Sequence, residues 1–485
     1  MKKIDFSKAM KYLIAFLLPM LVVMGINHYL DNDSWDVLAE GRYIVENGIY
    51  HEDVLSMHEG FHATVQNYGF ATIFYLIHSV LGAPGIYLAM LVLNFVILFL
   101  LYKICMLLSN KNVKLSLILM AATDVVLAFG FIVTRAQMID YVVFLALIYV
   151  MELFIKTGKI KHLLWIPLFS VAMINLHASS WWMLFAIMVA YIVGGIKNYK
   201  LWPLILAFVV SLPLGFLNPY GIEMILTIFN GYGSMAGLDF VKELRPFNPL
   251  VGYNLIFFLA VVVGVVLQIF AKNKTKVRHL LLFFGFLFMG LTSLKGFSEV
   301  ILVLFFPLAY VYKDFKFPQI FDNVKIGKAV AVWTGLLLAG VTLCVLVMVT
   351  INIPNRPERA MVEAMDTIDR EVGDKNKKDL KVYVGYNQGG YVEYRGYPAY
   401  LDPRGEYFVK AVNKKEDILQ EYIDVKNGKI KVSDFLTKYD FDFLLVEEYY
   451  EEALSNLNDE RYELIYSSDE NETRLYKKVE ALKEM

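Results

Sequence analysis

Acidic residues that could act as a catalytic base follow directly after the first apolar stretch. The segment DNDSWDVLAEGRYIVENGIY, residues 31–50, begins with Asp31, Asp33 and Asp36. A carboxylate at the membrane surface can accept a proton from a substrate hydroxyl or hold a metal ion. The segment also has the spacing of an amphipathic helix along the membrane, with Ser34 as the expected N-cap. The structural alternative is that the two leading aspartates only stabilise the helix N-terminus, by about 0.3–1 kcal/mol each.

A second acidic residue, Asp140, lies in the short polar turn FIVTRAQMIDYVV, beside Arg135 and Gln137. Charged residues at the end of a membrane span usually face a cavity or one another. Two interpretations stay open. Arg135 pairs with Asp140 and stabilises the fold, or it binds the phosphate of a lipid next to Asp140.

Further polar side chains lie in segments that we expect on the same side of the membrane as Asp140. They are Asn175, His177, Glu243, Arg245 and Lys295. Taken alone, His177 is more typical of a structural histidine at the interface. Together, however, these segments supply carboxylate, guanidinium, ammonium and imidazole groups. The stability of a helix bundle alone does not explain why all four kinds of group occur there.

The elements that must position these residues are membrane helices. The 485-residue chain is 57% hydrophobic and only 19% charged, with a mean hydropathy of +0.50, which is far too apolar for a soluble domain. Apolar stretches predict eleven crossings. The stretches are about 11–30, 85–102, 115–133, 141–155, 163–175, 181–196, 201–217, 251–271, 280–292, 300–312 and 329–350. Asp124 falls inside one of them and is either hydrogen-bonded within the bundle or lines a cavity.

The distribution of Lys and Arg supports this layout. Connecting segments on the side of the N-terminus hold 20 of these residues, and those on the other side before residue 351 hold five. Cytoplasmic loops carry such an excess, so we expect the N-terminus inside and the C-terminal tail outside. Counting residues 67–82 as a further crossing would invert every later loop. We therefore expect a helix in the outer interface there, within an outer loop that spans residues 31–84.

The C-terminal part has the composition of a soluble domain. From residue 355 it holds 21 basic and 29 acidic residues, a net charge of −8. LKVYVGYN, FDFLLVEE, ERYELIYSS and TRLYKK predict strands, and residues 358–371 and 414–425 predict helices. NQGGYVEYRGYPAYLDPRGEYF predicts a loop at a sheet edge. We expect a transmembrane domain over residues 1–352 and a small α/β domain outside the membrane over residues 353–485.

Several classes of protein receive no support. The net charge of −1 offers no basic surface for nucleic acid. Cys105 and Cys344 fall in or beside predicted spans, so a disulfide framework is not expected. No Walker, Rossmann or zinc spacing occurs, and no nucleotide cofactor is expected. Residues 1–30 lack a small-residue cleavage site and predict a retained helix.

This layout resembles the GT-C superfamily of integral-membrane glycosyltransferases, which includes the protein O-mannosyltransferases and the aminoarabinose transferases of lipid A. Asp31-Asn32-Asp33-Ser34-Trp35, followed by GRYIVENG, is similar to its bacterial first-loop pattern. Asp140 lies where the acid of the second outer loop is expected. Four further motifs are similar to a large bacterial branch, and the resemblance covers residues 10–410. The motifs are RAQ (135–137), NLH (175–177), LNPYG (217–221) and GGYVEYRGYPAYLDPR (389–404).

The resemblance implies an inverting hexosyl or pentosyl transferase in a bacterial plasma membrane. Its donor would be a polyprenyl-phosphate-linked sugar, and its acceptor a glycan, lipid or protein of the cell envelope on the outer face. Asp33 is then the base, with Asp31 as the alternate, and Asp140 orients the acceptor or shares a divalent metal ion with Asp33. The residues implied for the donor phosphate are Arg135, Arg245, Lys295 and His177. Those implied for orienting the acceptor are Gln137, Asn175 and Glu243.

Two other functions fit the sequence. A transporter or flippase for a lipid-linked or small polar solute would also need a polar cavity and Asp124, but no repeated half or paired broken helices indicate alternating access. A non-catalytic GT-C-like envelope assembly protein would keep the fold and use its tail to bind a partner. Substitution of Asp33 separates the enzyme from the scaffold, because only the enzyme would lose its activity while expression is retained.

Overall fold

The computed structural model of the chain describes residues 6–27, 30, 32–235, 242–317, 328–352, 359–447, 454 and 457–479. Its contacts define two compact units. The helical unit comprises Met1–Tyr29, Pro84–Asn218 and Gly237–Ile353, and the tail unit comprises Leu30–Ala83, Pro219–Ala236 and Pro354–Met485. The sequence predicted a division between residues 352 and 353. The first outer loop instead forms one compact unit with the C-terminal tail.

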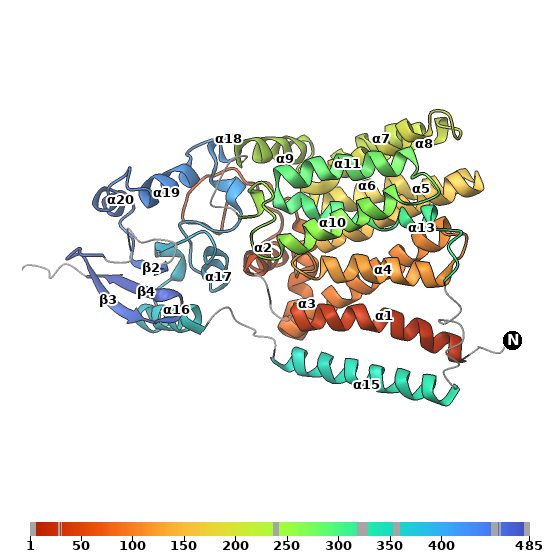
Figure 1. The fold of residues 1–485 in the computed structure, drawn as a ribbon. Helices are drawn as coiled ribbons and strands as arrows, with labels where there is room; N and C mark the ends of the chain where they lie inside the picture. Colours follow the sequence, from red (N-terminus) through yellow and green to blue (C-terminus); the bar gives the residue numbers. More distant parts are fainter. Residues whose placement is uncertain are drawn as a thin grey trace, which may run out of the picture. The chain divides into compact units, whose positions relative to one another are not determined.

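The helical unit contains helices at the positions of all eleven predicted apolar stretches (Figure 1). Its helices are α1 (Phe6–Ile26), the second part of α3 (Tyr68–Leu108), α4 (Val113–Leu127), α5 (Gln137–Thr157), α6 (Trp165–Leu176), α7 (Trp181–Gly195), α8 (Trp202–Ser211), α10 (Asn254–Ile269), α11 (Val277–Thr292), α12 (Phe297–Leu304), α13 (Leu308–Val311) and α15 (Lys328–Asn352). Short 3₁₀ helices connect them: η1 (Ile160–Leu164), η2 (Ala178–Ser180), η3 (Pro213–Phe216), η4 (Lys242–Leu244) and η5 (Leu294–Gly296).

The helical unit makes the chain a membrane protein. Among the described residues, four helical segments are long and apolar enough to cross a membrane: Tyr68–Leu108, Gln137–Thr157, Ala178–Gly195 and Leu294–Val311. The remaining apolar helices of this unit are shorter. The number of eleven crossings stays a prediction.

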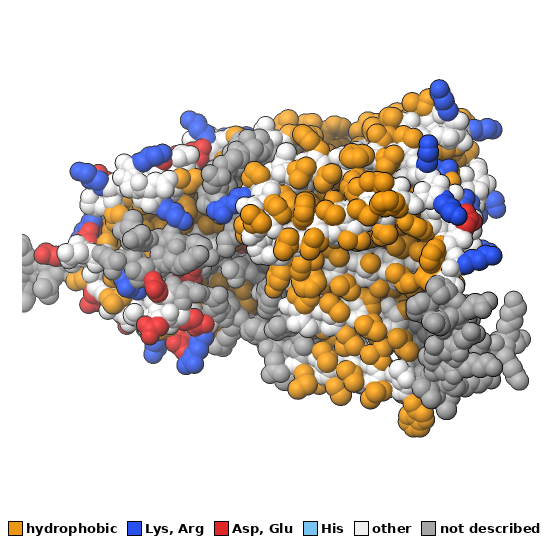
Figure 2. Space-filling model, viewed as in Figure 1, with side chains coloured by type: hydrophobic (Ala, Val, Ile, Leu, Met, Phe, Trp, Pro, Cys, Tyr) orange, Lys and Arg blue, Asp and Glu red, His pale blue; other side chains and the backbone are white. Residues whose placement is uncertain are grey.

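The surface of the helical unit separates apolar from basic side chains. Figure 2 shows hydrophobic side chains along the sides of its helices and Lys and Arg side chains gathered at one end. The exposed lysines among the described residues of the loops that the sequence assigns to the cytoplasm are Lys111, Lys156, Lys159, Lys161, Lys197, Lys200, Lys272, Lys274 and Lys316. Cytoplasmic loops of membrane proteins have this composition, which supports the predicted orientation.

A buried charged cluster fastens three helices of this unit together. Glu152 on α5 accepts hydrogen bonds from Arg278 Nε at 2.6 Å and from Arg278 Nη2 at 2.7 Å. His279 Nε2 lies 2.8 Å from Glu152 Oε1, and the Tyr191 hydroxyl donates to the same oxygen at 2.9 Å. A buried carboxylate needs such partners, because an unpaired charge in an apolar interior costs several kcal/mol. The sequence analysis did not predict this cluster.

The predicted interfacial helix over residues 67–82 is confirmed as a separate helical segment. At Gly82 the backbone has φ 64° and ψ −163°, which is not helical, so α3 consists of two helices joined at this residue. The left-handed φ favours glycine there. The first segment exposes apolar side chains at Ile73, Leu76, Val80 and Leu81. Its position in the membrane interface stays a prediction.

The tail unit combines the first outer loop, one helix from the middle of the chain and the α/β tail. Its four-stranded sheet has the order β1-β2-β4-β3. β1 (Val382–Val384) pairs in parallel with β2 (Phe443–Glu447), and β4 (Thr473–Lys478) pairs antiparallel with both β2 and β3 (Tyr462–Ser467). Its helices are α2 (Asp33–Asn47), the first part of α3, α9 (Ile222–Met235), α16 (Arg359–Val372), α17 (Gly389–Tyr394), α18 (Lys410–Asn413), α19 (Ile418–Lys426) and α20 (Val432–Tyr439), with the 3₁₀ helix η7 (Gly405–Phe408).

These elements confirm the predicted strands and helices of the tail, with one exception. The segment predicted as a loop at a sheet edge contains the buried helix α17. Gly389 and Gly390, which favour a turn in sequence statistics, instead allow the backbones of neighbouring segments to approach α17 closely. A Cβ atom at Gly389 would lie 1.9 Å from the carbonyl oxygen of Leu401, and one at Gly390 would lie 2.7 Å from the backbone nitrogen of Asp36.

The helix α2 forms as predicted, but it is buried within the protein, and its position on the membrane surface stays a prediction. Every residue from Ser34 to Gly41 is buried within the tail unit, because α17 packs on one side and the first part of α3 on another. Ser34 is 0% exposed and lies inside the helix, so it is not the N-cap. Asn32 occupies that position without a side-chain capping bond.

We predict that Gly390→Ala destabilises the tail unit by about 1–3 kcal/mol, the usual cost of an added methyl group in a tightly packed site. The new Cβ would meet the Asp36 backbone, so α17 must move away from α2. Thermal unfolding and limited proteolysis of the purified full chain measure the effect. Gly285→Ala on α11 is the matched control, because nothing lies within 4 Å of a Cβ there. Equal stability of the two variants would contradict the close-packing explanation.

Candidate functional site

Asp140 and His177 form the centre of a polar cluster in the helical unit. Asp140 lies in the first turn of α5, and His177 lies between α6 and η2. His177 Nδ1 is 2.8 Å from both carboxylate oxygens of Asp140, and the Ser180 hydroxyl donates to Asp140 Oδ2 at 2.7 Å. Asp140 is 1% exposed. A carboxylate bound to Nδ1–H fixes the tautomer and the ring orientation, so Asp140 presents the other nitrogen of His177, which lies 3.0 Å from Ser179 Oγ.

The predicted structural pair of Arg135 with Asp140 is wrong. Arg135, in the bend before α5, donates from Nη1 to Glu243 Oε1 on η4 at 2.5 Å. Burial favours the protonated form of Glu243. The attraction of Arg135, followed by that of Lys295, outweighs this effect, and the pKa of Glu243 is lowered. The carboxylate is therefore held ionised between cations. Its partner Arg135 is a quarter exposed.

Two loops that carry predicted phosphate-binding cations are joined through their backbones. Leu294 N–H donates to the carbonyl oxygen of Arg245 at 2.9 Å, and the Ser293 hydroxyl donates to that of Glu243 at 3.0 Å. Arg245 is exposed and Lys295 is half-buried. The structure thus brings Arg135, Glu243, Arg245 and Lys295 into one region of the helical unit, with more positive than negative charge.

The two amide residues predicted to orient the acceptor have different surroundings. Gln137, at the start of α5, donates to the Ser298 hydroxyl at 2.9 Å, and this hydroxyl lies 2.8 Å from Glu299 Oε2. Asn175 donates to the backbone carbonyl oxygens of Val171 and Leu217, at 2.7 and 2.9 Å. These bonds make Asn175 a connector between α6 and the LNPYG turn.

The other candidate base, Asp33, belongs to the tail unit. It is the first residue of α2 and is half-buried, at a helix end where the dipole favours an ionised carboxylate. Asp31 lies outside the described residues. The next acidic residue, Asp36, is buried, and burial and the neighbouring Asp33 raise its pKa well above the usual range.

A buried arginine, Arg404, connects the first outer loop with the tail inside this unit. Its guanidinium contacts Asp402 at 2.6 Å, Asp53 at 3.2 Å and Glu393 at 3.2 Å, and lies 3.6 Å from Glu40. All five residues are at most 7% exposed. Because one cation faces four carboxylates, protons must neutralise part of the cluster when it is buried.

Burial favours the protonated form of both glutamates. Burial raises the pKa of Glu40 to about 7, although Arg404 and the hydrogen bond from Tyr50 act in the opposite direction. Burial also raises the pKa of Glu393 well above its usual range. For Asp53, the attraction of Arg404 outweighs burial, and its pKa is lowered. The guanidinium therefore favours the ionised form of Asp53, whereas burial favours the protonated forms of Glu40 and Glu393.

The sequence analysis missed the cluster that Arg404 forms with Asp402, Glu393, Glu40 and Asp53. The available signal was the LDPR sequence, which places an aspartate and an arginine two residues apart in a segment rich in Tyr and Gly. The pairing itself joins residues about 350 positions apart, which no local pattern reveals.

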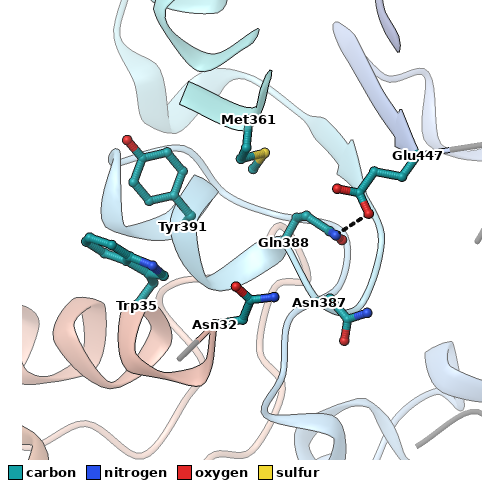
Figure 3. Close-up of a pocket in the computed structure, with 7 residues that line it drawn as sticks. All are labelled: Asn32, Trp35, Met361, Asn387, Gln388, Tyr391 and Glu447. Carbon is teal, nitrogen blue, oxygen red and sulfur yellow. Dashed lines mark hydrogen bonds between the residues drawn. The ribbon is translucent and has the colours of Figure 1, made fainter. Parts of the chain in front are cut away.

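A small hollow lies at the start of α2, next to Asp33 in the sequence. It has about 290 Å³ of empty space, part of it open to solvent. Figure 3 shows Trp35 and Tyr391 on one side of it and Gln388 with Glu447 on the other. The lining residues are Asn32, Trp35, Met361, Asn387, Gln388, Tyr391 and Glu447. Trp35 packs edge to face against Tyr391, with ring centroids 5.1 Å apart, which fixes that side of the hollow.

Among the described residues, no group of three or more His, Cys, Asp or Glu side chains is arranged to hold a metal ion. Asp33 and Asp140 belong to different compact units, and a divalent ion shared between them stays a prediction.

Comparisons with known proteins support the resemblance at the level of the fold. No protein-family model matches the chain, and no curated protein matches it. The crystal structure of the Archaeoglobus fulgidus oligosaccharyltransferase in the apo form aligns over 94% of this chain and 71% of its own, with a TM-score of 0.57 and 10% identity. The same protein tethered with an acceptor peptide containing the NVT sequon aligns over 96% of this chain and 74% of its own, with a TM-score of 0.59 and 8% identity.

The arabinofuranosyltransferase AftD from Mycobacteria aligns over 97% of this chain and 40% of its own, with a TM-score of 0.49 and 10% identity. The fold of the chain is therefore similar to that of the solved oligosaccharyltransferase, in agreement with the resemblance seen in the sequence.

We predict that the tail unit loses stability as the pH rises from about 4.5 to about 7. Between these pH values the folded protein keeps a proton on Glu40 that the unfolded chain releases. The stabilisation from this proton is therefore complete below about pH 4.5 and is lost above about pH 7. The shift corresponds to up to about 3 kcal/mol. Thermal unfolding of the full chain between pH 5 and 8 measures it.

Glu40→Gln is the matched variant, because its amide oxygen can still accept from Tyr50 and it carries no proton to lose. The unfolding temperature of this variant should depend less on pH than that of the wild type. Above pH 7 the variant should unfold at a higher temperature than the wild type. A variant with the same pH slope as the wild type would show that Glu40 does not carry the buried proton.

Proposed function

We propose that the protein is a membrane glycosyltransferase that moves a sugar from a polyprenyl-phosphate carrier to an acceptor hydroxyl on the outer face. The observation that carries this proposal is the fold, which is shared with a solved oligosaccharyltransferase over 96% of the chain. The polar residues at the ends of α5, α6, α11 and α12 support it, because they combine cations with a positioned imidazole.

The reaction needs a base and a stabilised leaving group. The acceptor oxygen attacks the anomeric carbon, and a new C–O bond forms while the bond to the carrier phosphate breaks. The bonding electrons leave with the polyprenyl phosphate, and the acceptor proton moves to a carboxylate. A single displacement of this kind inverts the configuration. Asp33 is the proposed base, because it is half-buried, accessible from solvent and placed at a helix N-terminus that favours its ionised form.

Cations of the helical unit are proposed to bind the carrier phosphate. Arg245 is exposed, and Arg135 and Lys295 lie near Glu243, which leaves net positive charge in their region. A phosphate that gains negative charge as the bond breaks is stabilised by such groups more strongly than the intact donor is.

The other predicted residues receive roles from their contacts. His177 is proposed to face the donor phosphate, and Asp140 is proposed as its positioning residue, because its buried carboxylate holds the imidazole by Nδ1. Gln137 and Glu243 remain proposed orienting residues. Asn175 is proposed to act indirectly, because its amide donates to two backbone carbonyl oxygens.

We predict that Asp33→Asn reduces sugar transfer about 10²–10⁴-fold, because the amide keeps the size of the side chain but cannot accept the acceptor proton. Mass spectrometry of envelope glycans from a deletion strain complemented with each variant measures the loss. Asp379→Asn, an exposed change in the tail, is the control and should restore the wild-type glycans. Full complementation by Asp33→Asn at equal expression would rule out Asp33 as the base.

We further predict that Arg245→Gln weakens binding of polyprenyl phosphate about 10–100-fold, the value of one charged hydrogen bond of about 1.5–3 kcal/mol. Equilibrium binding of radiolabelled polyprenyl phosphate to the purified protein tests this. The affinity for polyprenol, which lacks the phosphate, should not change, and Lys378→Gln in the tail should leave both affinities at wild-type values. Equal loss for phosphate and alcohol would indicate a disturbed lipid site and refute a phosphate contact.

A further inference from the structure

One helix of the tail unit, α9 (Ile222–Met235), is held in that unit by one of its sides. Met224 and Ile228 on this side are 0% and 1% exposed, and the helix packs against α18 and η7. Just before the helix, the Tyr220 hydroxyl donates to the carbonyl oxygen of Tyr50 at 3.1 Å. Contacts within the tail unit therefore set which side of α9 faces outward.

The outward side of α9 is apolar. Ile222, Leu226 and Phe229 are 51%, 53% and 60% exposed. Their spacing of four and three residues places them in one stripe along the helix. Glu223 is the single charged residue in the sequence of α9, and its Oε2 lies 3.6 Å from Nε2 of His62 in the tail unit. The stripe itself thus carries no charge that would favour contact with water.

The chain on both sides of α9 belongs to the helical unit. This unit ends at Asn218 before the helix and resumes at Gly237 after it. Ile222 follows Asn218 by four residues, a distance of at most about 14 Å for extended chain. Both connections lead to segments that the sequence assigns to the outer face of the membrane. A helix with such short connections at both ends stays close to the membrane surface.

The exposed apolar surface is continuous along the chain with that of the preceding membrane helix. Leu212, Phe216 and Leu217, at the end of α8 and in η3, are exposed as well. Large apolar side chains on the outside of a membrane domain contact lipid. The stripe on α9 continues this series in the sequence over about two further helical turns.

A second helical segment of the tail unit has the same combination of features. The first part of α3 exposes Ile73 and Leu76 and continues at Gly82 into a membrane helix. Its first residue, Tyr68, packs against Tyr220, with ring centroids 6.4 Å apart. The two helices of the tail unit that expose apolar stripes therefore start at one aromatic contact, and each is connected to a membrane helix by a few residues.

We propose that α9 is an interfacial helix that inserts its stripe, Ile222, Leu226 and Phe229, into the outer leaflet of the membrane. An amphipathic helix in the plane of the membrane buries its apolar side at the boundary between headgroups and acyl chains. Lipid fits this surface better than a protein partner does, because the flanking chain leads into the membrane and the stripe offers no charge for specific recognition. The tail unit then has a membrane contact of its own, whatever reaction the protein performs.

Site-directed spin labelling tests the insertion on the full-length protein in nanodiscs of phosphatidylethanolamine and phosphatidylglycerol. Cys105→Ala and Cys344→Ala remove the two native thiols, and Ile222→Cys, Leu226→Cys and Phe229→Cys each introduce one label. The measurement compares the collision rate of the label with O₂, which dissolves in lipid, and with a water-soluble nickel chelate. The chelate is excluded from the acyl region because its polar groups would lose their hydration there.

Two further labels calibrate the result. Val92→Cys, on the membrane part of α3 and 63% exposed, is the lipid reference, and Asn427→Cys, exposed at the end of α19, is the water reference. We expect a ratio of O₂ to nickel collisions at the three stripe positions that exceeds the ratio at Asn427 by about threefold or more, because the label lies among acyl chains. Asn230→Cys, an exposed position beside the stripe, should give a lower ratio than Phe229→Cys.

Three results would overturn the proposal. Ratios at Leu226 and Phe229 equal to that at Asn427 would place the stripe in water. Low collision rates with both reagents would show that protein covers it, from another part of the chain or from a second copy. Equal ratios at Phe229 and Asn230 would show that α9 does not lie in the interface with one side in lipid. The labelled side chains are exposed, so each variant should unfold within about 2 °C of the cysteine-free protein.

Discussion

The guanidinium of Arg404 is the interaction on which the tail unit depends. It lies among four buried carboxylates, two from the first outer loop and two from the tail segment that carries it. Without this cation the carboxylates would face only one another in an environment that penalises charge. The loop that carries Asp33 and the tail that carries Tyr391 are therefore held in one compact unit by electrostatics as well as by apolar packing.

Close backbone approach completes the same junction. Gly390 allows α17 to pack directly on the backbone of α2 at Asp36, and Trp35 packs against the rings of Tyr391 and Tyr394. The first-loop motif and the tail motif, which the sequence separates by more than 350 residues, thus line the same hollow. This arrangement explains why Gly, Tyr and acidic residues recur together in the tail segment.

In the helical unit, burial separates structural charges from those available to a substrate. Glu152 is satisfied by Arg278, His279 and Tyr191, and the Asp140 carboxylate by His177 and Ser180. Arg245 remains exposed. A cation with solvent access can contact an incoming phosphate without first breaking a buried ion pair. For this reason Arg245 is the stronger candidate for binding the donor phosphate.

The sequence by itself determined the membrane helices, the strands and helices of the tail and the fold class, because hydrophobic runs, alternation and charge are local properties of the chain. It also named Asp140 and His177 as residues of one region. Only the tertiary structure decided that Arg135 pairs with Glu243, that α2 is buried, and that Arg404 joins the first loop to the tail. Such pairings depend on which distant segments meet, and the cost of burying a charge appears only after they have met.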